Sequence, residues 1–97
     1  MHNVPITLKI MDIVSGTATN DEGMPLFVEL DKHLSKGQKV RLSMLEATPF
    51  STSFLNSSIG DIIDKYGFDT FRQMVIFIQF RPAQLKYLKM YFDQVTS

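Results

Sequence analysis

Hydrophobic and polar positions follow a period of two in two early segments of the chain. The segment Ile6–Val14 alternates apolar and polar side chains, which predicts a β-strand. Its Lys9 and the preceding Pro5 indicate a position near the edge of a sheet, where charged side chains and proline are tolerated. The segment Val40–Leu45 alternates in the same way and predicts a second strand.

A third strand is predicted at Gln73–Phe80, with a different pattern. It contains the nearly unbroken apolar run Met74–Ile78, which indicates a central strand covered on both faces. Three strands make a narrow sheet. The short polar link Thr17–Asn20, which we expect to be extended, leaves room for a small extra strand.

Three other segments place apolar side chains at helical spacing. Asn20 or Asp21 is the expected N-cap of the first helix, which ends before Gly37. The second helix follows the hydroxyl-rich segment Ser51–Ser53, and the third begins at Pro82. The apolar stripes of the three helices are Leu26, Phe27, Leu30 and Leu34, then Leu55, Ile59, Ile62, Ile63 and Tyr66, then Leu85, Leu88, Phe92 and Val95.

The order of elements is therefore βαβαβα. Strands that alternate with helices predict an α/β fold with a small, mainly parallel sheet and helices packed against it. The 97 residues suffice for a single domain spanning residues 1–97, and 44% of them are hydrophobic, enough to form a core. Gly60 lies inside the second helix, where we expect it to allow close packing against the sheet.

Charge and hydropathy narrow the classes of partner. Ten Lys and Arg residues balance ten Asp and Glu residues, and a net charge of zero argues against a nucleic-acid partner. The longest apolar run, Met74–Ile78, is too short to cross a bilayer. The first residues show no basic segment followed by an apolar one, so we expect no secretion signal. These features predict a cytoplasmic protein that binds neither nucleic acid nor membrane.

The chain offers little for catalysis. It has no cysteine, which excludes a disulfide, a cysteine zinc site and a cysteine nucleophile. His2 and His33 have no partner at metal-ligand spacing, so we interpret His33 as a surface helix residue and predict no metal site. No histidine lies near Ser53 in a triad arrangement, and no glycine-rich nucleotide motif occurs. We therefore predict no catalytic residue, no cofactor and no enzyme activity.

The segment Ser51–Ser53 carries the most distinctive chemistry. It follows the carboxyl end of the second strand, the edge at which open α/β sheets have their functional crevice. Short hydroxyl side chains cap helix starts, and a helix N-terminus attracts anions. One cap is enough for a helix, so Ser51, Thr52 and Ser53 are candidates for a phospho-acceptor or an anion-binding site. Simple N-capping is the alternative interpretation.

The same region carries a family resemblance. The segments Val40–Met44 and Pro49–Asn56 resemble the STAS-like family of small bacterial domains of unknown function. Upstream, Gly16–Gly23 resembles that family's Thr-Arg-acidic-Gly link, so the resemblance covers nearly the whole chain. It implies a STAS-type sandwich of sheet and helices. The better-known STAS relatives, the anti-sigma-factor antagonists, carry Asp-Ser-Ser-Gly-Leu at this turn, and a partner kinase phosphorylates one of the serines.

Against that motif, residues Ser51–Ser53 match in order the Asp, the first Ser and the phosphorylated Ser. Phe54 stands where the antagonists have Gly. Ser43 and Asn20 stand where the STAS-like family commonly has Asp and Arg. The resemblance thus places a phosphate at Ser53, where its charge would lie beside the unpaired amides of a helix start.

The resemblance implies a non-enzymatic regulatory or protein-interaction domain, switched at this helix start. The alternative is a small phosphate- or nucleotide-binding module that uses the same helix N-terminus. We expect a protein partner, and a homodimer is a second interpretation. Tyr87 and Tyr91 lie one helical turn apart and are the expected partner or homodimer contact. The predicted interaction surface consists of Thr19, Asn20, Phe54, Asn56, Tyr87 and Tyr91.

Overall fold

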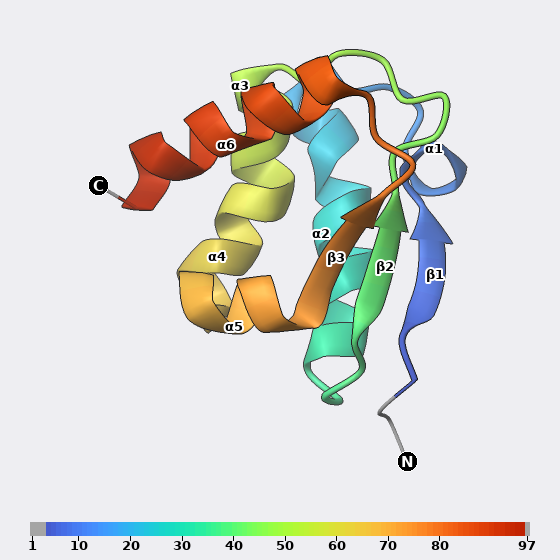
Figure 1. Cartoon of the computed structure of the whole chain (residues 1–97), viewed down its shortest axis with the longest axis vertical. Coiled ribbons are helices and arrows are strands. Elements are labelled where there is room, and N and C mark those ends of the chain that lie inside the picture. Colours follow the sequence, from blue (N-terminus) through green and yellow to red (C-terminus); the bar gives the residue numbers. More distant parts are fainter. Residues whose placement is uncertain (1–3, 97) are drawn as a thin grey trace.

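The fold is a mixed α/β arrangement around a small parallel sheet. The computed structural model describes residues 4–96. Its strands are β1 (Ile6–Lys9), β2 (Val40–Ser43) and β3 (Val75–Ile78), which are parallel and lie in the order β1-β2-β3 (Figure 1). The predicted fold class, a small parallel sheet with packed helices, is confirmed.

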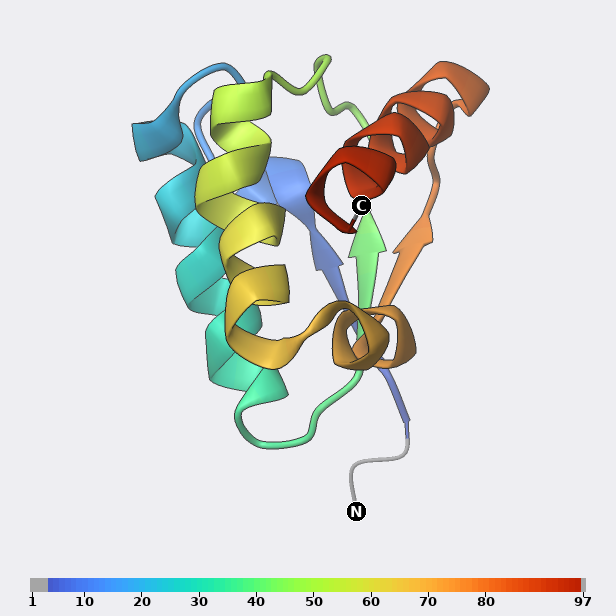
Figure 2. The ribbon, with the colours of Figure 1, turned by 90° about the vertical axis from the view of Figure 1, so that its left-hand side faces the viewer.

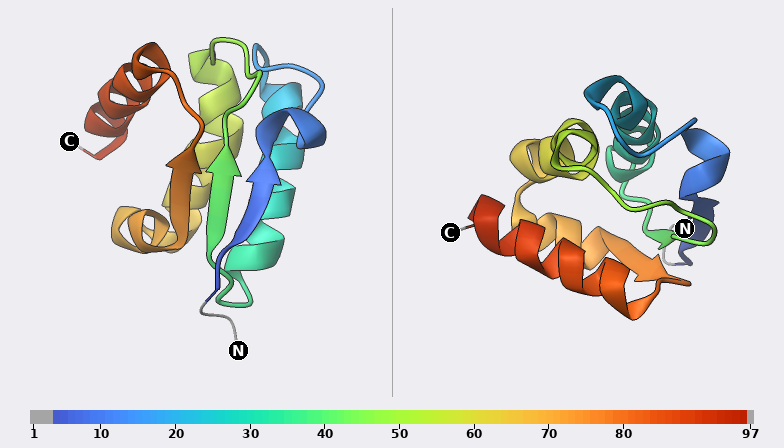
Figure 3. Two further views of the ribbon diagram at one scale, coloured as in Figure 1. Left: turned by 45° about the vertical axis from the view of Figure 1, so that its right-hand side comes forward. Right: turned by 90° about the horizontal axis from the view of Figure 1, so that it is seen from above.

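The helices gather mainly on one face of this sheet. They are α1 (Ile10–Ile13), α2 (Asn20–Leu34), α3 (Thr52–Leu55), the π-helix η1 (Asn56–Gly60), α4 (Asp61–Tyr66), α5 (Phe68–Met74) and α6 (Pro82–Thr96). The elements α3, η1 and α4 follow one another directly, so the predicted second helix is a continuous helical run with a π-helical turn inside it. Figure 3 shows α2 and this run behind the sheet, with α5 and α6 beside β3.

Side chains alternate across the sheet and define its inner and outer faces. Val40 and Leu42 of the central strand are fully buried and point toward the helices. Arg41 lies between these two residues and is in register with Thr7 of β1 and Ile76 of β3. All three side chains are exposed on the opposite face. The hydrophobic core therefore lies between the inner face of the sheet, α2 and the helical run from α3 to α4.

The prediction of a central third strand is wrong. β3 lies at an edge of the sheet, and β2 is the central strand. Only Val75–Ile78 is extended, because Met74 belongs to α5 and Gln79 turns the chain with a φ of 55°. The apolar run was misleading because Val75 is buried while Ile76 is 44% exposed on the uncovered face.

The first predicted strand lies at an edge, as expected, but it is shorter than predicted. β1 ends at Lys9, and the single turn α1 begins at Ile10, whose side chain is fully buried. The segment of residues 17–20 contains no strand in the described part of the chain, so the sheet there has three strands only.

α6 contacts the rest of the molecule mainly through its middle. Figures 1 and 2 show its C-terminal end projecting away from the sheet, and Val95 is accordingly 42% exposed. The buried side chains are Leu88 and Tyr91, so the predicted stripe is wrong at its C-terminal end. Tyr91 fits because Gly60 has no side chain, and a Cβ there would collide with the Tyr91 hydroxyl. Gly60 thus allows close packing against α6 and not, as predicted, against the sheet.

An aromatic cluster holds α6 to α5 and β3. The Phe92 ring of α6 lies 5.5 Å from the Phe68 ring and 5.8 Å from the Phe71 ring, both of α5. It also lies 6.4 Å from the Phe77 ring of β3. These separations are typical of stabilising ring pairs. The cluster anchors α6 through Phe92, and a hydrogen bond from Gln84 to the Ala47 carbonyl holds its N-terminal half beside the loop that follows β2.

Candidate functional site

The carboxyl ends of the three parallel strands lie at the same end of the sheet, at the top of Figure 1. The link after α1 and the loop after β2 are tied together there by Thr17, which is only 3% exposed. Its hydroxyl donates to the Pro49 carbonyl at 2.9 Å, and its carbonyl accepts from the Ser51 amide at 2.9 Å. The two segments singled out in the sequence are therefore adjacent in the fold. Thr17, which connects them, was not predicted as a site residue.

Ser51 is the N-cap of α3. Its hydroxyl accepts a hydrogen bond from the Phe54 amide at 3.0 Å and donates one to the Ala18 carbonyl at 2.7 Å. The first bond satisfies an amide that the helix cannot pair internally, and the second joins α3 to the link before α2. Ser51 therefore has a structural role both as an acceptor and as a donor of a hydrogen bond.

Thr52 and Ser53 are exposed and are not needed as caps. The Thr52 hydroxyl lies 3.4 Å from the Tyr87 hydroxyl of α6. The Ser53 hydroxyl makes no hydrogen bond within residues 4–96. The amides of both residues belong to the first turn of the helix, where no preceding helical carbonyl can accept them.

Ser51 and Ser53 can be separated by mutation. We expect Ser51→Ala to lower the free energy of unfolding by about 1–2 kcal/mol, because the cap and the bond to Ala18 are both lost. Ser53→Ala is the matched control and is expected to stay within about 0.5 kcal/mol of the parent. Urea denaturation followed by circular dichroism measures both, and equal losses in the two variants would contradict the assigned roles.

The start of α2 differs from the prediction. Thr19, rather than Asn20 or Asp21, is the N-cap, and it forms a capping box with Glu22. The Glu22 carboxylate accepts from the amides of Ala18 and Thr19, both at 3.0 Å, and these bonds lower its pKa. Thr19 and Asn20 remain exposed beside α3. The Asn20 carbonyl accepts from a hydroxyl of η1 and so joins the two helix starts.

Two of the residues predicted for the interaction surface are buried. Phe54 is fully buried and stacks on Phe50 with 5.5 Å between ring centroids. Tyr91 is 4% exposed, and its hydroxyl donates to the Asn56 side-chain oxygen at 2.7 Å. Burial raises the pKa of Tyr91, with smaller contributions from nearby acidic groups. The prediction was wrong for both residues. Local sequence does not show that Phe54 stacks on Phe50, and helical spacing does not show that α6 turns Tyr91 toward η1. Asn56 is exposed, as expected.

Tyr87 lines a groove beside α3. The groove has a volume of about 350 Å³ and lies between the loop after β2 and the first turns of α6. One side consists of Ala47, Pro49 and Phe50, and the other consists of Arg81, Ala83, Gln84 and Tyr87. It is mostly apolar, with a single formal charge from Arg81.

Gln84 links the two sides of this groove. Its side-chain oxygen accepts from the Arg81 amide at 2.6 Å, and its side-chain nitrogen donates to the Ala47 carbonyl at 3.2 Å. The first bond closes the N-terminus of α6 in the manner of a capping box. Gln84 was missed in the sequence, although a glutamine three residues after the start of a helix is a recognisable indication of this role.

Ser43 lies at the carboxyl end of β2 and is 2% exposed. Its hydroxyl donates to the Gln79 side-chain oxygen after β3 and accepts from the Leu45 amide at 3.2 Å. Ser43 therefore links the carboxyl ends of β2 and β3 through hydrogen bonds between uncharged groups.

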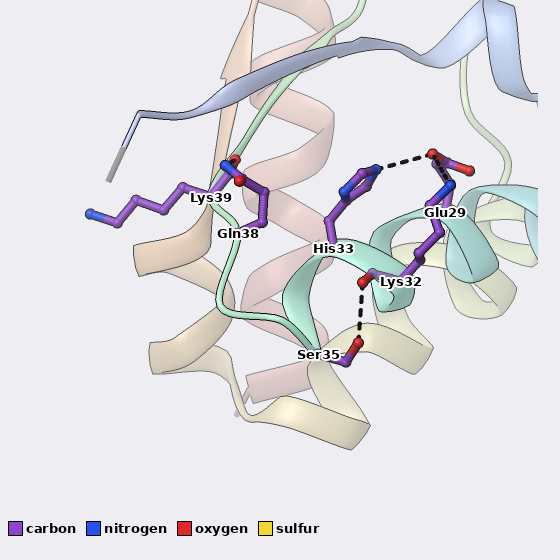
Figure 4. Close-up of polar contacts among 6 residues, drawn as sticks. All are labelled: Glu29, Lys32, His33, Ser35, Gln38 and Lys39. Carbon is purple, nitrogen blue, oxygen red and sulfur yellow. Dashed lines mark hydrogen bonds and ion pairs between the residues drawn. The ribbon is translucent and has the colours of Figure 1, made fainter. Parts of the chain in front are cut away.

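His33 is half-buried on α2 rather than fully on the surface. Its Nε2 lies 3.1 Å from a Glu29 carboxylate oxygen, as Figure 4 shows, and this contact lowers the pKa of Glu29. Ser35 donates to the Lys32 carbonyl nearby. Within residues 4–96 no group of three or more His, Cys, Asp or Glu side chains is placed to hold a metal ion. His2 lies outside the described residues.

A family model described as a STAS-like domain of unknown function matches residues 22–84, which is more than half of the chain. The chain belongs to this family. The match runs from the first turn of α2 to Gln84 and so includes β2, the hydroxyl-rich helix start, β3 and one side of the groove. Comparisons with curated proteins and with solved structures found no match.

The predicted family is thus confirmed, and the parallel three-stranded sheet with packed helices agrees with a STAS-like fold. Membership of a STAS-like family is consistent with a non-catalytic module. No helix in the described part of the STAS-like domain is both long and apolar enough to span a bilayer.

Proposed function

We propose that this STAS-like domain is a non-enzymatic regulatory domain that binds a partner protein through the surface formed by α3 and the Thr17–Asn20 link. In this proposal, phosphorylation of Ser53 switches the binding. The proposal rests on one observation: Ser51 alone serves as the cap, and the exposed Ser53 hydroxyl is not engaged within the described residues.

The position of Ser53 favours a phosphate for electrostatic reasons. A phosphoryl group there adds negative charge and three acceptor oxygens in the first turn of a helix. The partial positive charge of the helix N-terminus and the first-turn amides of Thr52 and Ser53 would stabilise that charge. The same group would change the shape and charge of the adjoining surface of Thr19 and Asn20, both of which are exposed.

Mass analysis of the protein isolated from its native host tests the switch. We expect a fraction of the wild-type chain to carry one phosphate, located at Ser53 by peptide mapping, and this mass to be absent from Ser53→Ala. Thr52→Ala is the matched control, because Thr52 is an exposed neighbouring residue that also carries a hydroxyl, and it should retain the phosphate. Absence of phosphate under all growth conditions would refute the switch.

Partner binding is measured separately from phosphorylation. Proteins that co-purify with the wild-type chain are identified and compared with those captured by Ser53→Asp and Ser53→Ala. The proposal predicts that the aspartate variant, which adds a negative charge, captures a different set or amount of partner than the alanine variant. Identical capture by all three chains, or no specific partner, would count against a regulatory interaction domain.

A phosphate- or nucleotide-binding module is the second candidate function. It is favoured by the same first-turn amides of Thr52 and Ser53, which suit an anion. Thermal unfolding with added ATP, ADP or inorganic phosphate separates the two functions. A ligand that binds the folded state raises the melting temperature with increasing concentration, whereas the interaction domain predicts no such rise.

A further inference from the structure

We infer that the groove between the loop after β2 and the N-terminal half of α6 binds an acidic peptide segment of a partner protein, with one apolar side chain of the peptide inserted in the groove. The inference deepens the proposed interaction function by naming the class of partner. It rests on that interaction role but does not depend on phosphorylation of Ser53.

The groove is formed before any partner binds. One side includes Phe50, which is 5% exposed and stacks on the fully buried Phe54. Its two sides are joined by the side chain of Gln84, which bonds to both Arg81 and Ala47. A preformed groove loses little conformational entropy on binding, which favours affinity for a short segment.

The groove continues as an apolar stripe along α6. Ala83, Tyr87 and Met90 follow one another at spacings of four and three residues, so they share one side of the helix. Tyr87 is 36% exposed and Met90 is 54% exposed. The groove volume of about 350 Å³ lies at the lower end of the range of binding pockets, roughly 300–1,000 Å³. This size suits a side chain of a peptide with further apolar contacts along Met90.

The charges beside the groove are complementary to an acidic segment. From Pro82 to Phe92, α6 carries Lys86 and Lys89 and no acidic residue, and Arg81 precedes it. Among residues 4–96 none of these three cations takes part in an ion pair. Lys86 is three residues from Ala83 and four from Met90, so it borders the stripe. An exposed apolar stripe bordered by unpaired cations favours a segment that carries acidic residues around an apolar one.

Selection from a phage-displayed library of random 12-residue peptides against the whole chain tests this inference. We expect the selected peptides to be enriched in Asp and Glu on both sides of a Leu, Met or Phe. One selected peptide is then labelled, and its affinity is measured by fluorescence anisotropy. Failure to select any peptide, or selection of peptides without acidic residues, would overturn the inference.

Variants of the chain locate the binding. Tyr87→Ala and Lys86→Glu are each expected to weaken the peptide by at least about tenfold, the size typical of an important interface contact. Lys39→Glu makes the same change of charge at an exposed residue beyond the amino end of β2 and is expected to change affinity by less than about twofold. Thermal unfolding checks that all variants are folded. Equal effects of Lys86→Glu and Lys39→Glu would show non-specific attraction and refute the site.

Sedimentation of the free chain provides a further test. If the chain forms a dimer that Tyr87→Ala abolishes, the stripe binds a second copy and the inference of an acidic peptide is wrong. A monomer in both cases supports it. The outcome for Ser53 is independent, because peptide affinity is measured on the unmodified chain. Loss of the switch with peptide binding intact would refute only the proposed regulation.

Discussion

Replacing Phe54 with alanine is expected to lower the free energy of unfolding by about 3–5 kcal/mol. The Phe54 ring is fully buried and stacks on Phe50 with an angle of 8° between the two planes. Alanine would leave a cavity under the start of α3 that the neighbouring backbone could fill only in part. This loss is a large share of the roughly 5–15 kcal/mol that stabilises a typical domain.

Urea denaturation followed by circular dichroism measures the effect of Phe54→Ala. Ser53→Ala is again the matched control, since it changes the exposed preceding residue and should shift stability by no more than about 0.5 kcal/mol. Phe54→Leu retains most of the apolar volume and should lose less stability than Phe54→Ala. Its free energy of unfolding is measured instead if the alanine variant does not fold. A Phe54→Ala loss as small as that of the control would show that this side chain is exposed, as the sequence had suggested.

Gly23→Ala is expected to destabilise the chain by about 1–2 kcal/mol, although alanine is the better helix former. A Cβ at residue 23 would lie 2.5 Å from the Phe54 carbonyl oxygen, and the Ser57 hydroxyl is also too close. The nearest backbone atom belongs to another helix, so α2 and the run from α3 to η1 would have to separate. Overpacking of this kind costs about 1–3 kcal/mol or more, which outweighs the gain of about 1 kcal/mol in helix propensity.

The adjacent residue is the control for Gly23→Ala. Met24 lies in the same helix but is 56% exposed, so Met24→Ala is expected to change stability by less than about 0.5 kcal/mol. Thermal unfolding of the two variants gives the comparison, since 1 kcal/mol corresponds to about 4–8 °C in a domain of this size. A rise in melting temperature for Gly23→Ala would contradict the close packing of the two helices.

The π-helical turn η1 takes part in this close contact. Ser58 is fully buried, and its hydroxyl donates to the Phe54 carbonyl at 2.7 Å. Ser57 donates to the Asn20 carbonyl at 2.7 Å and so joins η1 to the start of α2. Both hydroxyls therefore hydrogen-bond to backbone carbonyls where η1 packs against α3 and α2. The serines after Phe54 therefore serve packing, whereas Ser53 does not.

Several features of the fold were predictable because they depend on neighbouring residues in the chain. The alternation around Val40 predicted β2. The second helical run begins after the N-cap Ser51 and ends at Gly67, which has a positive φ of 88°. The family resemblance also came from local segments, chiefly Pro49–Asn56. Because capping and periodicity act over a few residues, they can be read from a single sequence.

The errors concern residues whose surroundings come from distant parts of the chain. The run containing Ile76 has the composition of a covered strand, but none of the helices in the described part of the chain covers the outer face of β3. The helical spacing of Tyr91 from Tyr87 indicated an exposed neighbour of Tyr87. The Tyr91 side chain is instead buried against η1, next to Gly60. In each case the pattern shows which positions are apolar and not what lies against them.

The sequence by itself determined that this protein is a small α/β domain of the STAS-like family, with hydroxyl groups at the helix start that follows its second strand. Only the tertiary structure decided which of those hydroxyls is engaged within residues 4–96, because the Ser51 hydroxyl bonds to Phe54 and Ala18 whereas the Ser53 hydroxyl has no partner there. It also formed the groove, whose two sides are separated by more than 30 residues in sequence and joined through Gln84. Capping and periodicity act between near neighbours, whereas burial and grooves arise where distant segments pack.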